Sequence, residues 1–223
     1  VDAVISLMDT NSVAIAAVSS TPDDGTIRLW KYAPARITPV LRPYHDGAGS
    51  TNWTKAPGMQ AYLEKRIAEF SHKGIGEFHL NNTDPEDRPL LREIARIALA
   101  RNIPLHIHAD AEPVRMMFEV EPKLTILWAH AGMTEPPEIV DAMLDRYPRL
   151  YADTSYRELD ILTGSGEMSP AWRAVIIKHA DRLLVGTDTW VNNQWDIYAE
   201  LIALNRQWLA TLPPDIAEKI ASK

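Results

Sequence analysis

Short apolar runs rich in β-branched residues alternate along this chain with amphipathic helical patterns. Such alternation is typical of repeated strand and helix units, and it predicts a parallel sheet whose strands all point the same way. Several runs are apolar at consecutive positions, as strands covered on both faces require. The seven predicted strands are residues 13–19, 37–44, 74–80, 103–109, 124–130, 149–155 and 182–188.

Helix signals fill the segments between these strands. Apolar residues recur at helical spacing over residues 59–71 and again from Asp84 to Asn102. Ser169 and Pro170 form an N-cap and first-turn pair for a further helix. The opening run VDAVISLMD looks like the tail of another helix.

The length of the chain favours one domain. Its 223 residues, 46% of them apolar, are enough for one buried core and too few for two. A barrel of eight strand and helix pairs takes about 250 residues. Seven strands behind a leading helix therefore predict an α/β barrel of the TIM type without its first strand. We expect a single domain over residues 1–223 that is truncated at both ends.

Three longer segments carry no clear pattern and are expected to be loops. They cover residues 19–36, 46–58 and 156–170. Loops of this length in a compact domain often form lids or walls of a pocket.

The composition disfavours several kinds of partner. The net charge of −7, the pI near 5.5 and the lack of a Lys or Arg run argue against nucleic acid and anionic membranes. The sequence contains no run of about 18 apolar residues, and nothing at its start reads as a signal peptide. We expect a soluble protein, cytoplasmic by default, that acts on a small molecule. The sequence leaves open whether it forms a homo-oligomer.

Four predicted strands end at or near a residue that can bind a metal ion. These residues are Glu77, His108, His130 and Asp188. Because the carboxyl ends of strands in a parallel barrel meet at one mouth, we expect the four side chains to come together. The chain has no Cys, so His and carboxylates are the ligands available, and they suit a divalent ion such as zinc. The sequence therefore predicts a hydrolytic site with one or two metal ions, most simply zinc.

The predicted chemistry assigns roles to two of these residues. A metal lowers the pKa of a bound water from about 15.7 to about 7, which makes hydroxide available at neutral pH. Asp188 would take the proton and pass it to the leaving group, while the metal or His130 polarises the scissile carbonyl. Asp188 and His130 are therefore the predicted catalytic residues.

Each of these residues also has a structural interpretation. His108 and His130 could be buried histidines with ordinary hydrogen bonds, and Glu77 could pair with an Arg of a neighbouring strand. His106 shares the strand face of His108 and is expected to pack or to support it, although the two could also form a clamp of two ligands. A carboxylate at the end of a buried strand is costly unless it is paired or metal-bound, which favours a functional role for Asp188.

Polar and aromatic residues that follow other strand ends are candidates to bind substrate. They offer anion recognition and stacking, although packing within loops is the alternative. His72 and His179, at predicted helix ends, are expected to face solvent or to cap carbonyls. The predicted substrate-binding residues are Arg42, Tyr44, His45, His79, Tyr156, Arg157 and Trp190.

The strand ends PLHIHA, LWAHAG and LVGTD, in this order and spacing, resemble those of the amidohydrolase superfamily, in particular its amidohydrolase-related branch. The resemblance covers nearly the whole chain and implies a TIM-barrel, metal-dependent hydrolase. It maps metal ligands onto His108 and Asp188, and a second ligand or base onto His130. Glu77 resembles a fourth-strand Glu that bridges metals in some members. The first-strand His-x-His pair of the family has no counterpart before Val1.

Several functions remain open at this level. The first hypothesis is a metal-dependent hydrolase of an amide, ester or lactone in a small, possibly carboxylated substrate. The resemblance also allows a metal-dependent decarboxylase of an aromatic or unsaturated acid. A metal-independent lactonase of the same fold would use Asp188 as base. A non-catalytic binding protein with a degenerate barrel is the remaining alternative.

Overall fold

The computed structural model describes residues 1–222 of the chain. They belong to two compact units, Val1–Leu127 and Trp128–Lys223, which we call unit one and unit two. In both units parallel strands alternate with helices, and the fold is an α/β barrel of the TIM type with seven strands in this part of the chain. None of the helices within residues 1–222 combines the length and apolar character needed to cross a lipid bilayer.

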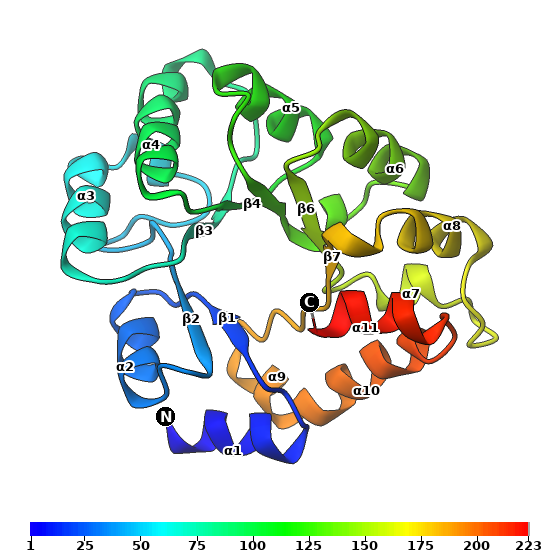
Figure 1. The fold of residues 1–223 in the computed structure, drawn as a ribbon. Helices are drawn as coiled ribbons and strands as arrows, with labels where there is room; N and C mark the ends of the chain where they lie inside the picture. Colours follow the sequence, from blue (N-terminus) through cyan, green and yellow to red (C-terminus); the bar gives the residue numbers. More distant parts are fainter. Residues whose placement is uncertain (223) are drawn as a thin grey trace. The chain divides into compact units, whose positions relative to one another are not determined.

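Unit one is built on parallel strands with helices along one side, as Figure 1 shows for α2, α3 and α4. Strands β1 to β4 pair in chain order, each parallel to the next. The elements are α1 (Asp2–Thr10), β1 (Ala16–Val18), α2 (Asp24–Tyr32), β2 (Ile37–Leu41), η1 (Trp53–Lys55), α3 (Met59–Glu69), β3 (Gly74–His79), η2 (Pro85–Asp87), α4 (Arg88–Arg101), β4 (Leu105–His108), α5 (Ala111–Val120) and β5 (Ile126–Trp128), which ends at the first residue of unit two.

The core of unit one explains why β3 and β4 are apolar. Ile75 and Phe78 of β3 and Leu105 and Ile107 of β4 are fully buried. The stripe on α4 predicted from the sequence, including Leu91, is buried as well. This packing fixes the register of the two strands, and that register sets where their polar ends lie.

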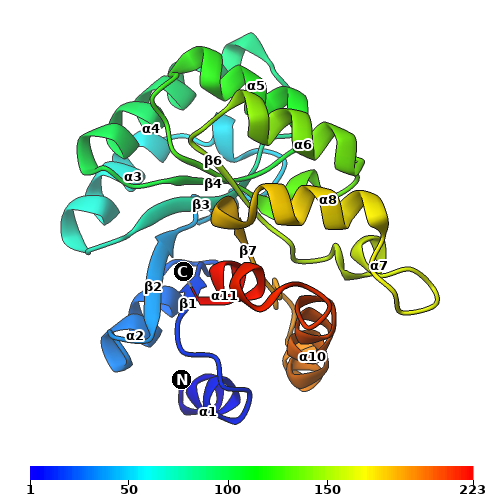
Figure 2. The same ribbon diagram turned by 45° about the vertical axis from the view of Figure 1, so that its right-hand side comes forward.

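Unit two begins with a turn and continues through two short strands and several helices. Strand β6 pairs in parallel with β7, and Figure 2 shows α10 and α11 side by side. The elements are η3 (Ala129–Gly132), α6 (Pro137–Arg146), β6 (Leu150–Asp153), α7 (Glu158–Ile161), α8 (Pro170–Lys178), η4 (Ala180–Arg182), β7 (Leu183–Leu184), α9 (Asn192–Asp196), α10 (Tyr198–Leu209) and α11 (Pro214–Ser222).

All seven predicted strands are present, each shorter than its apolar run. The helices predicted over residues 59–71 and from Asp84 to Asn102 are confirmed as α3 and as η2 with α4. The prediction of a loop over residues 19–36 is wrong, because this segment contains α2. The loop predicted over residues 156–170 contains the short helix α7.

The predicted surroundings of two histidines are also wrong. His72 is buried, and its Nε2 lies 3.1 Å from both carboxylate oxygens of Asp23. His179 is buried too, with its Nε2 2.7 Å from Asp141 Oδ1. Neither ring faces solvent, because each one pairs with an acidic residue from another segment of its own unit.

Candidate functional site

The ends of β3 and β4 place two imidazole rings face to face in unit one. The strand register sets His79 opposite His108. Their rings stack with centroids 4.1 Å apart and planes at 19°. Because the preceding residues of both strands are buried, these histidines stand where the apolar core of unit one ends.

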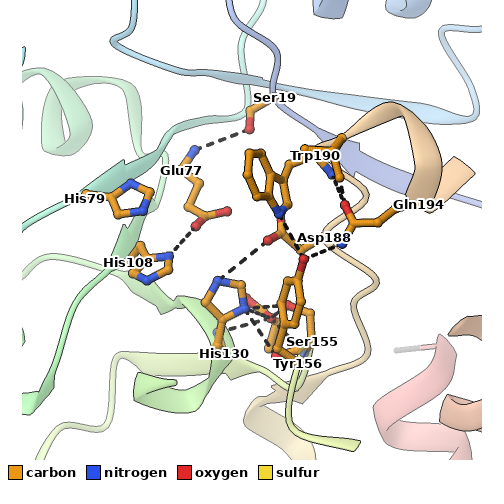
Figure 3. Close-up of polar contacts among 12 residues, drawn as sticks. Ser19, Glu77, His79, His108, His130, Ser155, Tyr156, Asp188, Trp190 and Gln194 are labelled. Carbon is orange, nitrogen blue, oxygen red and sulfur yellow. Dashed lines mark hydrogen bonds and ion pairs between the residues drawn. The ribbon is translucent and has the colours of Figure 1, made fainter. Parts of the chain in front are cut away.

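The Glu77 carboxylate holds the ring of His108 in one orientation (Figure 3). His108 Nδ1 lies 2.9 Å from Glu77 Oε1. An ionised carboxylate only accepts hydrogen bonds, so His108 donates from Nδ1, and in the neutral form of the ring the lone pair lies on Nε2. This is the arrangement found around metal-ligating histidines, whose other nitrogen commonly donates to a carboxylate.

Arg42 and Ser19 hold Glu77 in turn. Arg42 Nε donates to the backbone oxygen of Glu77 at 2.9 Å, and its Nη2 lies 3.4 Å from Glu77 Oε2. The backbone N–H of Glu77 donates to Ser19 Oγ at 3.4 Å. The sequence predicted Arg42 as an anion-binding residue and offered an Arg partner as the structural interpretation of Glu77. The structure contains that ion pair.

Tyr44 and Trp53 fix His79. The Tyr44 hydroxyl accepts the backbone N–H of His79 at 2.8 Å and lies 2.8 Å from His79 Nδ1. Burial raises the pKa of Tyr44 to about 12, so the hydroxyl keeps its proton at neutral pH. Trp53 Nε1 donates to the backbone oxygen of His79 at 2.7 Å. Trp53 is expected from the sequence only to pack, and no local pattern marks this hydrogen bond, because its partner lies 26 positions away.

His45 lies beside Asp46 and a residue of α3. Its ring stacks on Tyr62 with centroids 3.7 Å apart, and its Nδ1 lies 3.1 Å from Asp46 Oδ2. Unit one thus brings Arg42, Tyr44, Glu77, His79 and His108 into one hydrogen-bonded and stacked set. These contacts leave His45 outside that set.

In unit two, His130 lies in a tight turn directly after β5. His130, Ala131 and Gly132 all have positive φ angles, of 55°, 44° and 79°. A Cβ added at Gly132 would lie 2.3 Å from Trp128 Cζ2, so the turn closes only with glycine there. The result is a His130 side chain that is 1% exposed.

Two residues at the end of β6 contact His130. The backbone N–H of His130 donates to Asp153 Oδ1 at 3.2 Å. His130 Nδ1 lies 2.8 Å from Ser155 Oγ and 3.2 Å from the Ser155 backbone oxygen. The sequence analysis did not select Asp153 or Ser155, although the run DTS at the end of a predicted strand carries both.

Asp188 and the aromatic pair Tyr156 and Trp190 also lie near His130 in unit two. Asp188 Oδ2 lies 3.9 Å from His130 Nε2. The ring of Tyr156 meets that of His130 edge to face, with centroids 5.5 Å apart. The Tyr156 hydroxyl accepts from Trp190 Nε1 at 2.9 Å and from Gln194 Nε2 (Figure 3). Four predicted site residues, His130, Tyr156, Asp188 and Trp190, are therefore neighbours.

Arg157 has contacts that favour a structural role over the predicted role in substrate binding. It is 2% exposed, and its guanidinium donates to the backbone oxygens of Met133 and Glu135. It also lies 4.7 Å from the centroid of the Trp172 ring. Burial lowers the pKa of Arg157. The side chain fastens the segment that follows the His130 turn.

A second group of acidic and imidazole side chains in unit two is balanced by a lysine. Asp141, Asp145 and His179 are close enough to hold an ion. The Lys178 ammonium, however, donates to Asp141 Oδ1 at 2.8 Å and to Asp145 Oδ2 at 2.7 Å. These ion pairs join α6 to α8, and we assign no metal to this group.

Parallel strands that alternate with helices, and that end in imidazole and carboxylate side chains, define an α/β-barrel protein with groups suited to bind a metal ion. A family model described as Amidohydrolase matches residues 37–223, and the chain belongs to this family. Members of the family are typically metal-dependent and act on small molecules. Glu77, His108 and His130 are among the described side chains that could hold a metal ion.

Solved structures confirm the fold. A probable 2-pyrone-4,6-dicarboxylic acid hydrolase from Acinetobacter baumannii, with citric acid bound, is 12% identical with a TM-score of 0.53 over 98% of this chain and 87% of that one. The phosphotriesterase homology protein from Escherichia coli, with phosphate in its active site, is 9% identical with a TM-score of 0.59 over 88% and 76%. Dihydroorotase from Campylobacter jejuni is 15% identical with a TM-score of 0.51 over 92% and 69%. Among curated proteins, no sequence matches this chain.

Proposed function

We propose that this protein is a metal-dependent hydrolase of an amide, ester or lactone in a small, carboxylated substrate. The proposed metal ligands are His108, His130, Asp188 and Glu77, with zinc as the ion. The observation that carries the proposal is the 3.9 Å between His130 Nε2 and Asp188 Oδ2. Zinc bonds to nitrogen and oxygen are about 2.1 Å each, so two lone pairs at this distance can reach one ion.

The surroundings of the two histidines fit such a donor set. His108 is held through Nδ1 by Glu77, and His130 is held through Nδ1 by Ser155. Both neutral rings can then offer Nε2, as ligating histidines do. Glu77 supports His108 in this arrangement. Its further role as a ligand stays a prediction from the sequence.

The proposed reaction needs a proton acceptor and a route to the leaving group. A bound zinc ion would supply a water whose pKa is lowered to about 7. Asp188 would accept a proton from the attacking water and pass it to the leaving nitrogen or oxygen. Arg42 balances the charge of Glu77. His130 would help to hold the metal ion, and the ion would polarise the scissile carbonyl.

Substrate contacts are assigned to side chains beside these groups. Tyr156 and Trp190 offer an exposed aromatic pair next to His130, and Tyr44 and His79 offer polar contacts in unit one. The substrate-binding role of His45 stays a prediction from the sequence. The carboxylate of the substrate is proposed from the basic character of Arg42. The predicted absence of nucleic-acid and membrane partners and the cytoplasmic location stay predictions.

The test of this proposal is Asp188→Asn, assayed against a panel of carboxylated lactones, esters and amides. The substitution removes the proton acceptor with little change in size. We expect kcat to fall by about 10²- to 10⁴-fold, the range of general-base catalysis. Asp196→Asn, at an exposed acidic residue of α9, is the matched control and should keep kcat within about twofold.

Each alternative has its own outcome in this experiment. Full activity of Asp188→Asn would remove Asp188 as the base. Full lactone hydrolysis by chelator-treated protein would identify the metal-independent lactonase. Release of CO₂ from an unsaturated acid without hydrolysis would identify the decarboxylase. A protein that binds the panel and converts none of it would be the non-catalytic barrel.

A further inference from the structure

We propose that Ser155, held by Asp153, is a positioning residue that fixes His130 as the tautomer with its proton on Nδ1. The ring then directs its lone pair through Nε2, the nitrogen that faces Asp188. The part of this inference that concerns metal binding rests on the proposed function. The tautomer itself is a property of the protein without metal.

The first step of the argument is the direction of the Ser155 hydroxyl proton. Asp153 Oδ1 accepts the backbone N–H of His130 at 3.2 Å and the backbone N–H of Ser155 at 3.1 Å. Ser155 Oγ lies 2.5 Å from the same oxygen. Two oxygens this close need one proton between them. Asp153 Oδ1 already accepts two N–H groups and so does not carry that proton, which means that the Ser155 hydroxyl donates to Asp153.

The second step is the state of the facing nitrogen. With its proton directed to Asp153, Ser155 Oγ presents a lone pair to His130 Nδ1 at 2.8 Å. The Ser155 backbone oxygen, which can only accept, lies 3.2 Å from the same nitrogen. An unprotonated Nδ1 would set its lone pair against two acceptors. Nδ1 therefore carries a proton, and Nε2 holds the lone pair of the neutral ring.

Burial makes this arrangement rigid. His130, Ser155 and Asp153 are 1%, 2% and 7% exposed. A Cβ added at Gly186 would lie 3.1 Å from Ser155 Cβ and 3.3 Å from Asp153 Oδ1, so the chain closes tightly over this pair. Since bulk water cannot easily replace a lost partner here, the serine and the aspartate decide the tautomer.

The test is ¹⁵N NMR of the histidine rings in full-length, chelator-treated protein, with the His130 signal assigned by its loss in His130→Gln. We expect the wild-type ring to carry its proton on Nδ1. Ser155→Ala should shift the ring nitrogens toward a mixture of tautomers, because one of two acceptors is lost. Ser155→Thr, which keeps the hydroxyl, should restore the wild-type signal.

Thr154→Val is the matched control. Thr154 is fully buried, and its Oγ1 donates to the Leu184 backbone oxygen at 3.2 Å, so the variant deletes a neighbouring hydroxyl away from His130. Its ring signals should equal those of wild type. A wild-type His130 with its proton on Nε2 would overturn the inference without any variant. Unchanged ring signals in a folded Ser155→Ala would overturn it as well.

Zinc affinity, measured by competition with a chromophoric chelator, tests the consequence for metal binding. Ser155→Ala should weaken zinc binding by about tenfold, the lower end for partners of ligating histidines, and Thr154→Val should not change it. Equal zinc affinity of Ser155→Ala and wild type would contradict the proposal that Ser155 positions His130 for metal binding. If the wild-type protein binds no zinc, the proposed function fails, while the ring signals still decide the tautomer.

Discussion

Glu158 is a carboxyl group whose surroundings disfavour its ionised form. It lies in the first turn of α7, 8% exposed, with Asn205 Nδ2 3.4 Å from its Oε1. Burial raises its pKa above the usual 4.5, and the nearby charge of Asp153 acts in the same direction. The proposed mechanism does not use this group, so its titration can be read as stability alone.

The free energy of unfolding of the wild-type protein should fall as pH rises, and Glu158→Gln should reduce that fall. The unfolded chain releases the Glu158 proton near pH 4.5, whereas the folded protein retains it to a higher pH. The free energy of unfolding therefore falls as pH rises from 4.5 through the raised folded pKa. Urea unfolding at about pH 4 and about pH 8 should show a smaller decrease in the variant than in wild type.

Glu167→Gln is the control for this prediction, because Glu167 is exposed in the loop before α8. It should show the same dependence on pH as wild type. An equally steep loss of stability in Glu158→Gln would mean that Glu158 ionises freely in the folded protein.

At the scale of elements, the turn η3 depends on its glycine. Gly132→Ala would force a side chain to φ 79° and set its Cβ 2.3 Å from Trp128 Cζ2. We expect a loss of about 2 kcal/mol or more in the free energy of unfolding. Activity should fall further than stability alone explains, because the same turn carries His130.

Gly164→Ala is the matched control, because a Cβ there meets no atom within 4 Å. Its free energy of unfolding and its kcat should stay close to wild type. Both variants are compared by urea unfolding and by kcat. A Gly132→Ala protein as stable and active as Gly164→Ala would show that the turn relaxes without strain.

A buried ion pair joins α2 to α3. Asp23 is 1% exposed, and its Oδ2 accepts from Arg66 at 2.7 and 2.9 Å. His72 lies on the same carboxylate. Asp23→Ala would leave the Arg66 guanidinium, whose side chain is only 13% exposed, without its main partner, and we expect urea unfolding to show a loss of about 3 kcal/mol.

Asp24 supplies the comparison for this prediction. Its side chain is 71% exposed and lies 3.3 Å from Arg66 Nη2. An exposed ion pair contributes about 1 kcal/mol or less, so Asp24→Ala should have a small effect. Equal losses for the two variants would mean that burial of Asp23 adds nothing.

The contrast between predicted and observed elements has a physical cause. The seven strands were predictable because apolar runs are local in sequence, and so were the strand ends at Glu77 and His108. Helix α2 was missed because contacts of Asp23 with residues more than 40 positions away help to hold it. The partners of His130 were missed for the same reason. Local sequence shows which side chains are polar, but tertiary packing decides which of them meet.

Arg157 shows that sequence position can also suggest a role that the observed contacts do not favour. Its position after a strand suggested a role in binding substrate. The backbone oxygens that it contacts belong to the segment after η3, more than 20 residues earlier. No sequence pattern near Arg157 marks these acceptors.

For the whole molecule, the proposed function predicts that zinc stabilises the fold. A ligand that binds only the folded state at 100 times its dissociation constant adds about 2.7 kcal/mol. We expect the melting temperature to fall on chelation and to recover with zinc, followed by calorimetry. Asp188→Asn should lose most of this response, while Asp196→Asn keeps it. If zinc does not change the melting temperature, the proposal that the folded protein binds a zinc ion is contradicted.

The hydrogen bond between Trp190 and Tyr156 has a practical consequence. Trp190 is 67% exposed, yet its indole nitrogen is tied to a phenol whose ring touches that of His130. One side of the indole faces solvent, and the other is held by the hydrogen bond to Tyr156. The wavelength of its emission maximum therefore depends on whether water around the ring is displaced. The fluorescence of Trp190 should therefore change when a ligand binds beside the groups proposed to react.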